Sequence, residues 1–167
     1  SQCRVPVVTH ESDYTPGLAN KINSRFADKI CVTFDDTLKF TGEKGVHTGT
    51  PIRPELYAGN KRRGLDFLGF DGKKPVLMIM GGSLGAAAIN EAVRAARPML
   101  ERTFDIVHIC GAGKAEKALD SACYKQYEFI SRELSDVFAA TDIVVSRAGA
   151  NAVFEFLALC KPMLLIP

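Results

Sequence analysis

The sequence predicts an α/β protein with a Rossmann-like, doubly wound parallel sheet. Short runs of β-branched and other apolar residues alternate along the chain with longer amphipathic stretches. This alternation is typical of consecutive strand–helix–strand units. Several of the short runs show no alternation of apolar and polar residues, which indicates strands buried on both faces, as in parallel sheets. Two of these runs lead directly into turns that contain glycine.

The expected elements follow from these patterns in order. Strands are predicted over residues 5–9, 29–34, 46–48, 75–80, 104–110, 127–130, 142–146 and 162–166. A helix is predicted over residues 86–101, where apolar side chains recur every three or four residues. Pro98 should end or kink this helix near its last turn. Thr15 and Pro16 predict the start of another helix, with threonine as N-cap and proline in the first position.

Composition narrows the class of protein. The chain has 167 residues, of which 47% are hydrophobic and 24% charged, as is usual for a globular domain. The net charge of +2 gives no support for nucleic-acid binding. The basic run 61–63 is interpreted as a solvated helix face. Five cysteines without a C-x-x-C pair argue against a disulfide framework and a zinc site, and they fit a reducing cytoplasm.

The chain is expected to be a piece of a longer protein. It begins at Ser1 without a methionine and stops at Pro167, directly after an apolar strand. A boundary is predicted between Thr50 and Lys74, where proline, glycine and charged residues concentrate. Residues 1–50 would be the remnant of one domain, because two or three strands are too few for an independent one. Residues 51–167 would be a second, truncated domain.

The first candidate binding segment is Met-Ile-Met-Gly-Gly-Ser-Leu-Gly-Ala, residues 78–86. Gly81, Gly82 and Gly85 allow a sharp turn and close approach of a ligand to the backbone. Amides at the start of the following helix favour a phosphate. Ser83 can donate to a phosphate oxygen or simply cap the helix, and the residues alone leave both interpretations open.

Two familiar nucleotide motifs are incomplete. The 78–86 segment lacks the full G-x-G-x-x-G fingerprint. Gly111-Ala-Gly-Lys114 resembles a P-loop superficially, but Ala115 follows the lysine and His108 occupies the place of the first glycine. The sequence also contains no Ser/His/Asp constellation and no cluster with metal-ligand spacing.

The second candidate segment is residues 142–156. An apolar strand again reaches a turn, and a helix is expected to begin near Gly149. From Ala152 to Cys160 every residue except Glu155 is apolar. A carboxylate on such a helix needs a cation, solvent or a ligand hydroxyl pair. Pairing with Arg147 or Lys161 and binding of a sugar diol both remain open.

Two further polar segments stand before the predicted boundary or within it. In Thr-Gly-Thr-Pro-Ile-Arg, residues 48–53, the proline stiffens a turn and Arg53 is placed to reach an anion, or is an ordinary surface arginine. In His-Glu-Ser-Asp-Tyr-Thr-Pro-Gly, residues 10–17, ionisable side chains follow a predicted strand, where ligands bind in open α/β sheets. His10 and Glu11 are tentative catalytic candidates.

Taken together and in this order, these segments resemble the MurG family of N-acetylglucosaminyltransferases. The matching stretches are His-Glu-Ser-Asp-Tyr-Thr-Pro-Gly-Leu-Ala-Asn (10–20), Thr-Gly-Thr-Pro-Ile-Arg (48–53), Gly-Gly-Ser-Leu-Gly-Ala (81–86), Phe-Ile (129–130), Ser-Arg-Ala-Gly-Ala (146–150), Glu155 and Lys-Pro (161–162). The resemblance implies a GT-B fold, with a C-terminal donor domain and a remnant of the N-terminal domain. It also implies inverting transfer of GlcNAc from UDP-GlcNAc to lipid I, giving lipid II for peptidoglycan, without a cofactor or a chelated metal.

The resemblance also implies roles for single residues. Ser83 and Arg53 would contact the diphosphate, and Gly81, Gly82, Gly85 and Gly149 would form the phosphate turns. The backbone of Ile130 would read the uracil edge, and Glu155 would hold the ribose hydroxyls. Asp13, where many members have asparagine, would contact the donor. The turn and helix start beneath the nucleotide would comprise Ala150, Asn151, Ala152, Val153 and Phe154.

The expected partners are UDP-GlcNAc, lipid I and, for the full-length protein, the inner face of the cytoplasmic membrane as a peripheral enzyme. The family's usual catalytic histidine and its GlcNAc-binding glutamine pair are expected outside this chain, so the chain alone is not expected to turn over. Covering of an exposed sheet edge predicts a homodimer. Three alternatives remain: another UDP-sugar-dependent GT-B transferase, a non-catalytic nucleotide-sugar-binding subunit, and a Rossmann-type oxidoreductase or nucleotide sensor.

Overall fold

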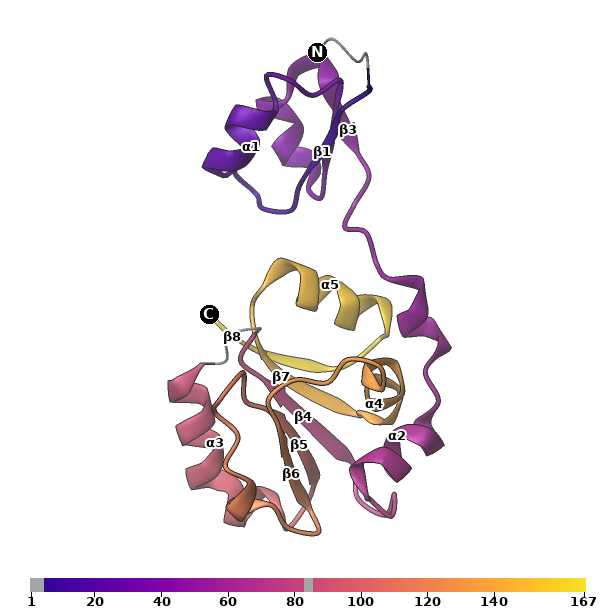
Figure 1. Cartoon of the computed structure of the whole chain (residues 1–167), viewed down its shortest axis with the longest axis vertical. Coiled ribbons are helices and arrows are strands. Elements are labelled where there is room, and N and C mark those ends of the chain that lie inside the picture. Colours follow the sequence, from indigo (N-terminus) through magenta and orange to yellow (C-terminus); the bar gives the residue numbers. More distant parts are fainter. Residues whose placement is uncertain (1–4, 83–85) are drawn as a thin grey trace. The chain divides into compact units, whose positions relative to one another are not determined.

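A computed structural model describes residues 5–82 and 86–167 of the chain. The chain divides into two compact units, Ser1–Ile52 and Arg53–Pro167 (Figure 1). Ser83 and Gly85, both predicted to contact phosphate, lie outside the described residues. Every strand pairing in the described part of the chain is parallel, as the sequence predicts.

The first unit is a small three-stranded sheet with strand order β1-β2-β3. Its core consists of Ala27, Ile30 and Val32, with Leu38 packed against them. Helix α1 buries none of its residues within this unit. The elements are β1 (Val8–Glu11), α1 (Leu18–Asn23), β2 (Lys29–Val32), the 3-10 helices η1 (Asp35–Phe40) and η2 (Gly42–Lys44), and β3 (Gly45–His47).

Two predictions for this unit were wrong at the level of residues. Strand β1 lies three residues later than its predicted start, so that His10 and Glu11 belong to the strand itself. Helix α1 begins at Leu18 with Gly17 as N-cap, not at Pro16. The physical reason is a buried carboxylate: Glu11 accepts a hydrogen bond from the Gly17 amide at 3.0 Å, which holds the preceding residues in a loop.

The second unit contains a five-stranded sheet with strand order β6-β5-β4-β7-β8. This order confirms the doubly wound class, because the chain starts at a central strand, builds outward to one side and then returns to build the other. The elements are η3 (Pro54–Ala58), α2 (Lys61–Leu68), β4 (Val76–Met80), α3 (Ala87–Leu100), β5 (Asp105–Ile109), η4 (Lys117–Leu119), β6 (Tyr124–Tyr127), α4 (Leu134–Ala140), β7 (Ile143–Arg147), α5 (Ala150–Ala158) and β8 (Met163–Ile166).

Helices cover both faces of this sheet (Figure 1). Helix α3 lies on one face, where Ile89 and Val93 pack against Leu77 and Ile79 of β4. Helices α4 and α5 share the other face and meet through the edge-to-face contact of Phe138 and Phe156, whose ring centroids are 5.5 Å apart. Strand β5 is buried along its whole length, whereas the edge strand β8 is half exposed.

A glycine lets helix α2 pack closely on α4. A Cβ atom at Gly64 would stand 2.1 Å from the Asp136 carbonyl oxygen and 2.9 Å from the Ala140 side chain. Gly69 ends α2 in the left-handed conformation, with φ 72°. The basic run 61–63 is exposed on this helix, as predicted for a solvated face.

One strand was predicted three residues too late. Strand β6 runs from Tyr124 to Tyr127 rather than over residues 127–130. Its sequence is polar, but Tyr124 and Gln126 are fully buried. Gln126 is accommodated there because it donates to the Glu116 carbonyl and accepts from Arg94. A polar edge strand of this kind gives no apolar run by which it can be recognised.

A polar network crosses the core between β5, β6 and α3. His108 is fully buried, with Tyr124 Oη 2.7 Å from its Nδ1 and Asn90 Oδ1 2.9 Å from its Nε2. The Asn90 amide nitrogen donates to the Cys110 carbonyl, so its oxygen faces the histidine and accepts from Nε2–H. Nδ1 then accepts from the tyrosine hydroxyl. Burial, reinforced by the charge of Arg94, lowers the His108 pKa to about 4.

Candidate functional site

The candidate site lies at the carboxyl edge of the five-stranded sheet, where strand order reverses. Strands β4 and β7 are neighbours, with Met80 opposite Ser146 in register. The chain leaves β4 toward β5 and leaves β7 toward β8, on the opposite side. Crevices open at such switch points, outside the carboxyl ends of the strands, and ligands bind in them. Gly81 and Gly82 follow β4, and Gly149 follows β7, so the described glycines of both predicted phosphate turns lie at this edge.

The turn after β7 leads directly into helix α5. Gly149 is its N-cap, and the Val153 amide donates to the Gly149 carbonyl at 3.0 Å. The first amides of a helix lack intrahelical acceptors and attract anions. The helix therefore begins where the sequence predicts, and its first five residues are Ala150, Asn151, Ala152, Val153 and Phe154.

Gly82 gives the turn after β4 its geometry. Its φ of 86° is left-handed, a conformation that glycine adopts without strain. An added Cβ at Gly82 would meet nothing within 4 Å, so the requirement is for backbone conformation rather than space.

Arg53 and Glu155 form a two-point ion pair beside this edge. Arg53 Nε donates to Glu155 Oε1 at 2.9 Å, and Nη2 donates to Oε2 at 3.1 Å. The carboxylate is largely buried, with 16% of its side chain exposed, whereas the arginine is 55% exposed. The interpretation that Glu155 pairs with Arg147 or Lys161 was wrong: Lys161 instead donates to the Thr141 carbonyl at 2.7 Å.

Ile130 lies in the connection between β6 and α4, three residues beyond the end of β6. Its side chain is half-buried, and the preceding Phe129 is 72% exposed. This connection leaves the carboxyl end of the same sheet and leads across it to α4 and β7. Whether its backbone contacts a base remains a prediction.

The candidate residues of the first unit form hydrogen bonds within that unit. The Glu11 carboxylate, 4% exposed, accepts from the amides of Asp13 and Gly17 at 3.0 Å each and from Asn20 Nδ2 at 2.9 Å. Burial opposes ionisation of Glu11, but these hydrogen bonds together hold its pKa below the usual value. His10 Nε2 lies 3.0 Å from the Gly49 carbonyl, to which it donates. Glu11 thus positions Asp13 rather than presenting a free base.

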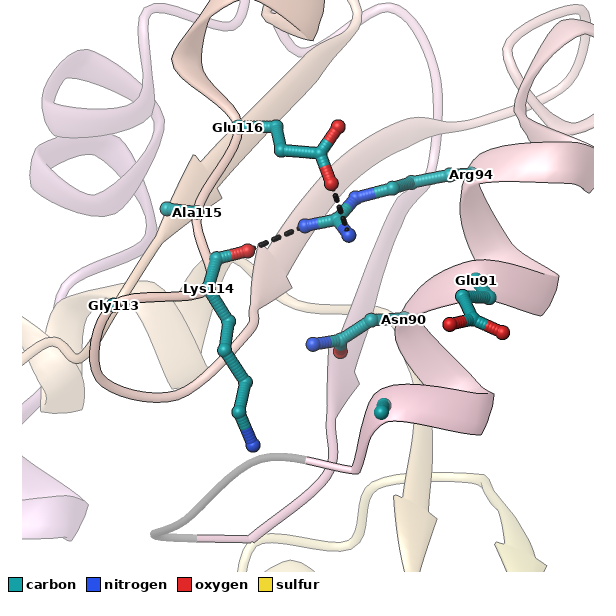
Figure 2. A pocket seen from close by; sticks show the side chains of 8 residues that line it. Asn90, Glu91, Arg94, Gly113, Lys114, Ala115 and Glu116 are labelled. Atoms are coloured by element: carbon teal, nitrogen blue, oxygen red, sulfur yellow. Dashed lines mark hydrogen bonds and ion pairs between the residues drawn. The ribbon is translucent and has the colours of Figure 1, made fainter.

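A pocket in the second unit was not expected from the sequence. A pocket of about 270 Å³ lies between α3 and the loop after β5 (Figure 2). Lys114, set aside in the sequence for lack of a complete P-loop, lines it together with Asn90 and Arg94. The only signal for this pocket in the sequence is the pair Gly111 and Gly113, both of which adopt left-handed φ.

Two features of the described residues bear on the class of site. Within residues 5–82 and 86–167, no three histidine, cysteine, aspartate or glutamate side chains are grouped so as to hold a metal ion. None of the helices in these same ranges has both the length and the apolar character required to cross a bilayer.

Comparison with known proteins identifies close relatives. Over 166 residues the chain is 57% identical to the UDP-N-acetylglucosamine--N-acetylmuramyl-(pentapeptide) pyrophosphoryl-undecaprenol N-acetylglucosamine transferase 2 of Bacillus cereus, covering 98% of this chain and 47% of that protein. The corresponding transferase of Clostridium botulinum is 52% identical, with 98% and 46% covered. The chain thus spans about half the length of the curated relatives it matches.

A solved structure and a family description agree with these relatives. The crystal structure of Acinetobacter baumannii MurG superposes with a TM-score of 0.65 and 25% identity, over 99% of this chain and 47% of that one. Residues 76–167 match the glycosyltransferase family 28 C-terminal domain. The resemblance to MurG proteins that the motifs predict is therefore confirmed, and the chain belongs to glycosyltransferase family 28.

Proposed function

We propose that this chain carries the donor-binding half of an N-acetylglucosaminyltransferase and binds UDP-GlcNAc at the carboxyl edge of its five-stranded sheet. The observation that carries the proposal is the placement of two glycine turns after β4 and β7, the neighbouring strands at the switch point. The names of the relatives supply the donor sugar and the reaction class.

The proposed binding mode requires an exchange of partners. Arg53 and Glu155 pair with each other in the structure. A ribose diol that donates to Glu155 would displace the guanidinium from the carboxylate, and Arg53 would then be free to turn to the diphosphate. The first amides of α5 and the turn at Gly82 would hold the phosphate oxygens.

Such an arrangement assists the departure of UDP without a metal ion. When the bond from the sugar to the diphosphate breaks, negative charge accumulates on the diphosphate. Fixed donors and a cation stabilise that charge more in the transition state than in the ground state. Arg53 would supply the cation and α5 the fixed amides.

For the whole protein, we propose transfer of GlcNAc to the undecaprenyl-pyrophosphoryl acceptor, lipid I, to give lipid II. The acceptor named for the relatives carries a polyprenyl chain, so a peripheral position on the inner face of the cytoplasmic membrane follows from the chemistry of the substrate. The 167-residue chain alone is proposed to bind donor without turnover.

Calorimetric titration with UDP, UMP and NAD tests the donor site. We expect UDP to bind more tightly than UMP, because the second phosphate adds charge for Arg53 and α5, and NAD to bind least. A Rossmann-type oxidoreductase would give the opposite order for NAD and UDP. Absence of UDP binding by a chain with a cooperative thermal melt would refute the proposal.

The homodimer is a separate prediction. The strands β1 and β3 are the edges of the three-stranded sheet, and Val8 on β1 is 63% exposed. Unpaired strand edges of this kind pair readily with a second chain. Light scattering at increasing concentration should show a dimer, and a monomer throughout the range would exclude it.

A further inference from the structure

We infer that Lys114 binds the diphosphate of the nucleotide ligand, from a pocket beside the sheet edge at which the nucleoside is proposed to bind. The inference rests on the proposed function for its ligand, and on the pocket between α3 and the loop after β5 for its site. Figure 2 shows that pocket, with Asn90, Glu91 and Arg94 on α3 and Gly113, Lys114 and Glu116 on the loop.

The position of the loop follows from the register of the sheet. Strands β4 and β5 are parallel neighbours, and Met80 lies opposite Ile109. The turn that begins at Gly81 and the loop that begins at Cys110 therefore leave the sheet side by side at its carboxyl edge. A diphosphate held by the first turn is thus within reach of groups on the second.

The loop is rigidly held, which distinguishes Lys114 from an ordinary surface lysine. Arg94 donates to the Lys114 carbonyl and forms an ion pair with Glu116, 2.6 Å from Nη1 to Oε1. The buried Gln126 donates from its amide to the Glu116 carbonyl at 2.6 Å. These contacts fix the backbone on both sides of the lysine, so its side chain starts from a defined position.

The left-handed glycines complete the turn. Gly111 and Gly113 have φ of 90° and 68°, which residues with a Cβ rarely adopt. The Lys114 amide donates to the Gly111 carbonyl at 3.1 Å and closes the turn. In Figure 2 the lysine side chain extends from this turn along the pocket, past Asn90.

The charges in the pocket are divided between its ends. Arg94 and Glu116 neutralise each other through their ion pair. Lys114 lies on the loop side of the pocket and Glu91 on the opposite, helix side (Figure 2). The pocket therefore suits a ligand that places its negative charge on the loop side and a neutral group on the helix side, as a nucleoside diphosphate joined to a neutral sugar can do.

Replacement of the lysine tests the inference and keeps the hydrogen bond from Arg94, because the backbone carbonyl of residue 114 accepts that bond. Lys114→Ala should keep the fold, shown by an unchanged thermal melt, and should weaken binding of UDP and of pyrophosphate about 10-fold, since hydrogen bonds to charged groups are the stronger kind. Lys114→Arg should restore most of the affinity. Lys73→Ala is the matched control, because it removes the same charge from an exposed site before β4, at the amino ends of the strands. It should change the affinity for UDP less than about 2-fold.

Each outcome is decisive. Tight UDP binding that Lys114→Ala and Lys73→Ala alter equally would overturn the inference and leave the proposed function standing. Failure of the unaltered chain to bind UDP would refute the proposed function. The pyrophosphate titration would then test the pocket by itself. Pyrophosphate binding that depends on Lys114 supports the pocket as an anion site, and any other result overturns the inference. If Lys114→Ala does not fold, an NMR titration of the unaltered chain with pyrophosphate replaces it. Chemical-shift changes at the backbone amides of residues 113–116 support the inference, and changes confined to other residues would overturn it.

Discussion

At the scale of single residues, the pairing of Arg53 with Glu155 predicts an uncommon pattern of binding losses. Glu155→Ala removes the proposed acceptor for the ribose hydroxyls but also releases Arg53. We expect UDP to bind about 10-fold more weakly, through loss of charge-assisted hydrogen bonds. Pyrophosphate, which has no ribose, should bind no more weakly and should gain from the released arginine. Isothermal titration of both ligands measures the two effects.

The matched control for this prediction is another arginine–carboxylate pair in the same unit. Arg63 and Asp136 have side-chain exposures of 65% and 16%, close to those of Arg53 and Glu155. Asp136→Ala should leave both affinities unchanged. A parallel loss of UDP and pyrophosphate binding in Glu155→Ala would contradict the exchange of partners.

The sequence allowed part of this site to be predicted. Glu155 was recognisable because it is the one charged residue on an otherwise apolar stretch. Its partner was not, because Arg53 lies 102 residues earlier and only the folded chain brings the two together. Glu11 shows the same limit of prediction from sequence. Its place after a predicted strand made it a tentative catalytic candidate, whereas its burial and three accepted hydrogen bonds give it a role in holding the loop.

The buried His108 predicts a loss of stability in mild acid. Its pKa is about 4 in the folded chain and about 6.5 when unfolded. Between these values the unfolded chain binds more protons, so the free energy of unfolding falls as the pH drops from 6.5 toward 4. The loss attributable to this residue is at most about 3 kcal/mol. Urea unfolding at a series of pH values measures it.

A variant and a spectrum check this assignment. His108→Gln should be less stable at neutral pH but should lack this part of the acid dependence, since no group at that position titrates. An NMR titration in which His108 itself protonates near pH 6.5 in the folded chain would exclude the explanation.

At the scale of elements, the close contact of α2 with α4 predicts that Gly64→Ala lowers the stability of the fold, although helix propensity favours alanine. Gly64→Ala should gain up to about 1 kcal/mol in helix propensity. Its Cβ would nevertheless stand 2.1 Å from a backbone oxygen of α4, and relief of such overpacking costs about 1–3 kcal/mol. We expect a net loss of stability, measured by urea unfolding.

Gly17→Ala serves as the control for this change. Gly17 also adjoins a helix, but its φ is −67° and an added Cβ would meet nothing within 4 Å. Gly17→Ala should therefore leave the free energy of unfolding nearly unchanged. If Gly64→Ala were as stable as Gly17→Ala, the two helices would have to be packed less closely than the structure has them.

The elements that could be predicted are those with a strong local pattern. Strand β4 and helix α3 were expected over residues 75–80 and 86–101 and lie at Val76–Met80 and Ala87–Leu100. Strand β6 and the start of α1 were misplaced because contacts with residues outside their own segments decide them. In β6, the buried Gln126 is satisfied by groups from α3 and from the loop after β5. In α1, a glutamate six residues upstream sets the N-cap.

At the scale of the whole molecule, alternating strands and helices predict the parallel, doubly wound class but not which strand pairs with which. The reversal at β4 and β7 makes the glycine turns after these strands neighbours, although about 65 residues separate them. The motifs could therefore be found in the sequence, whereas their convergence at one edge required the strand order.

The division of the chain predicts that donor binding resides in the second unit alone. Arg53, Glu155, Lys114 and the described turn glycines all lie within Arg53–Pro167. This unit contains the five-stranded sheet and its covering helices, whereas residues 1–52 offer three short strands and a helix without a buried residue. A domain of this size buries a smaller fraction of its surface on folding than a larger domain does, and its stability is correspondingly marginal. A chain of residues 53–167 should therefore unfold cooperatively and bind UDP within about 3-fold of the longer chain, whereas residues 1–52 should give poorly dispersed amide resonances. Loss of UDP binding by a folded 53–167 would contradict the assignment of donor binding to this unit alone.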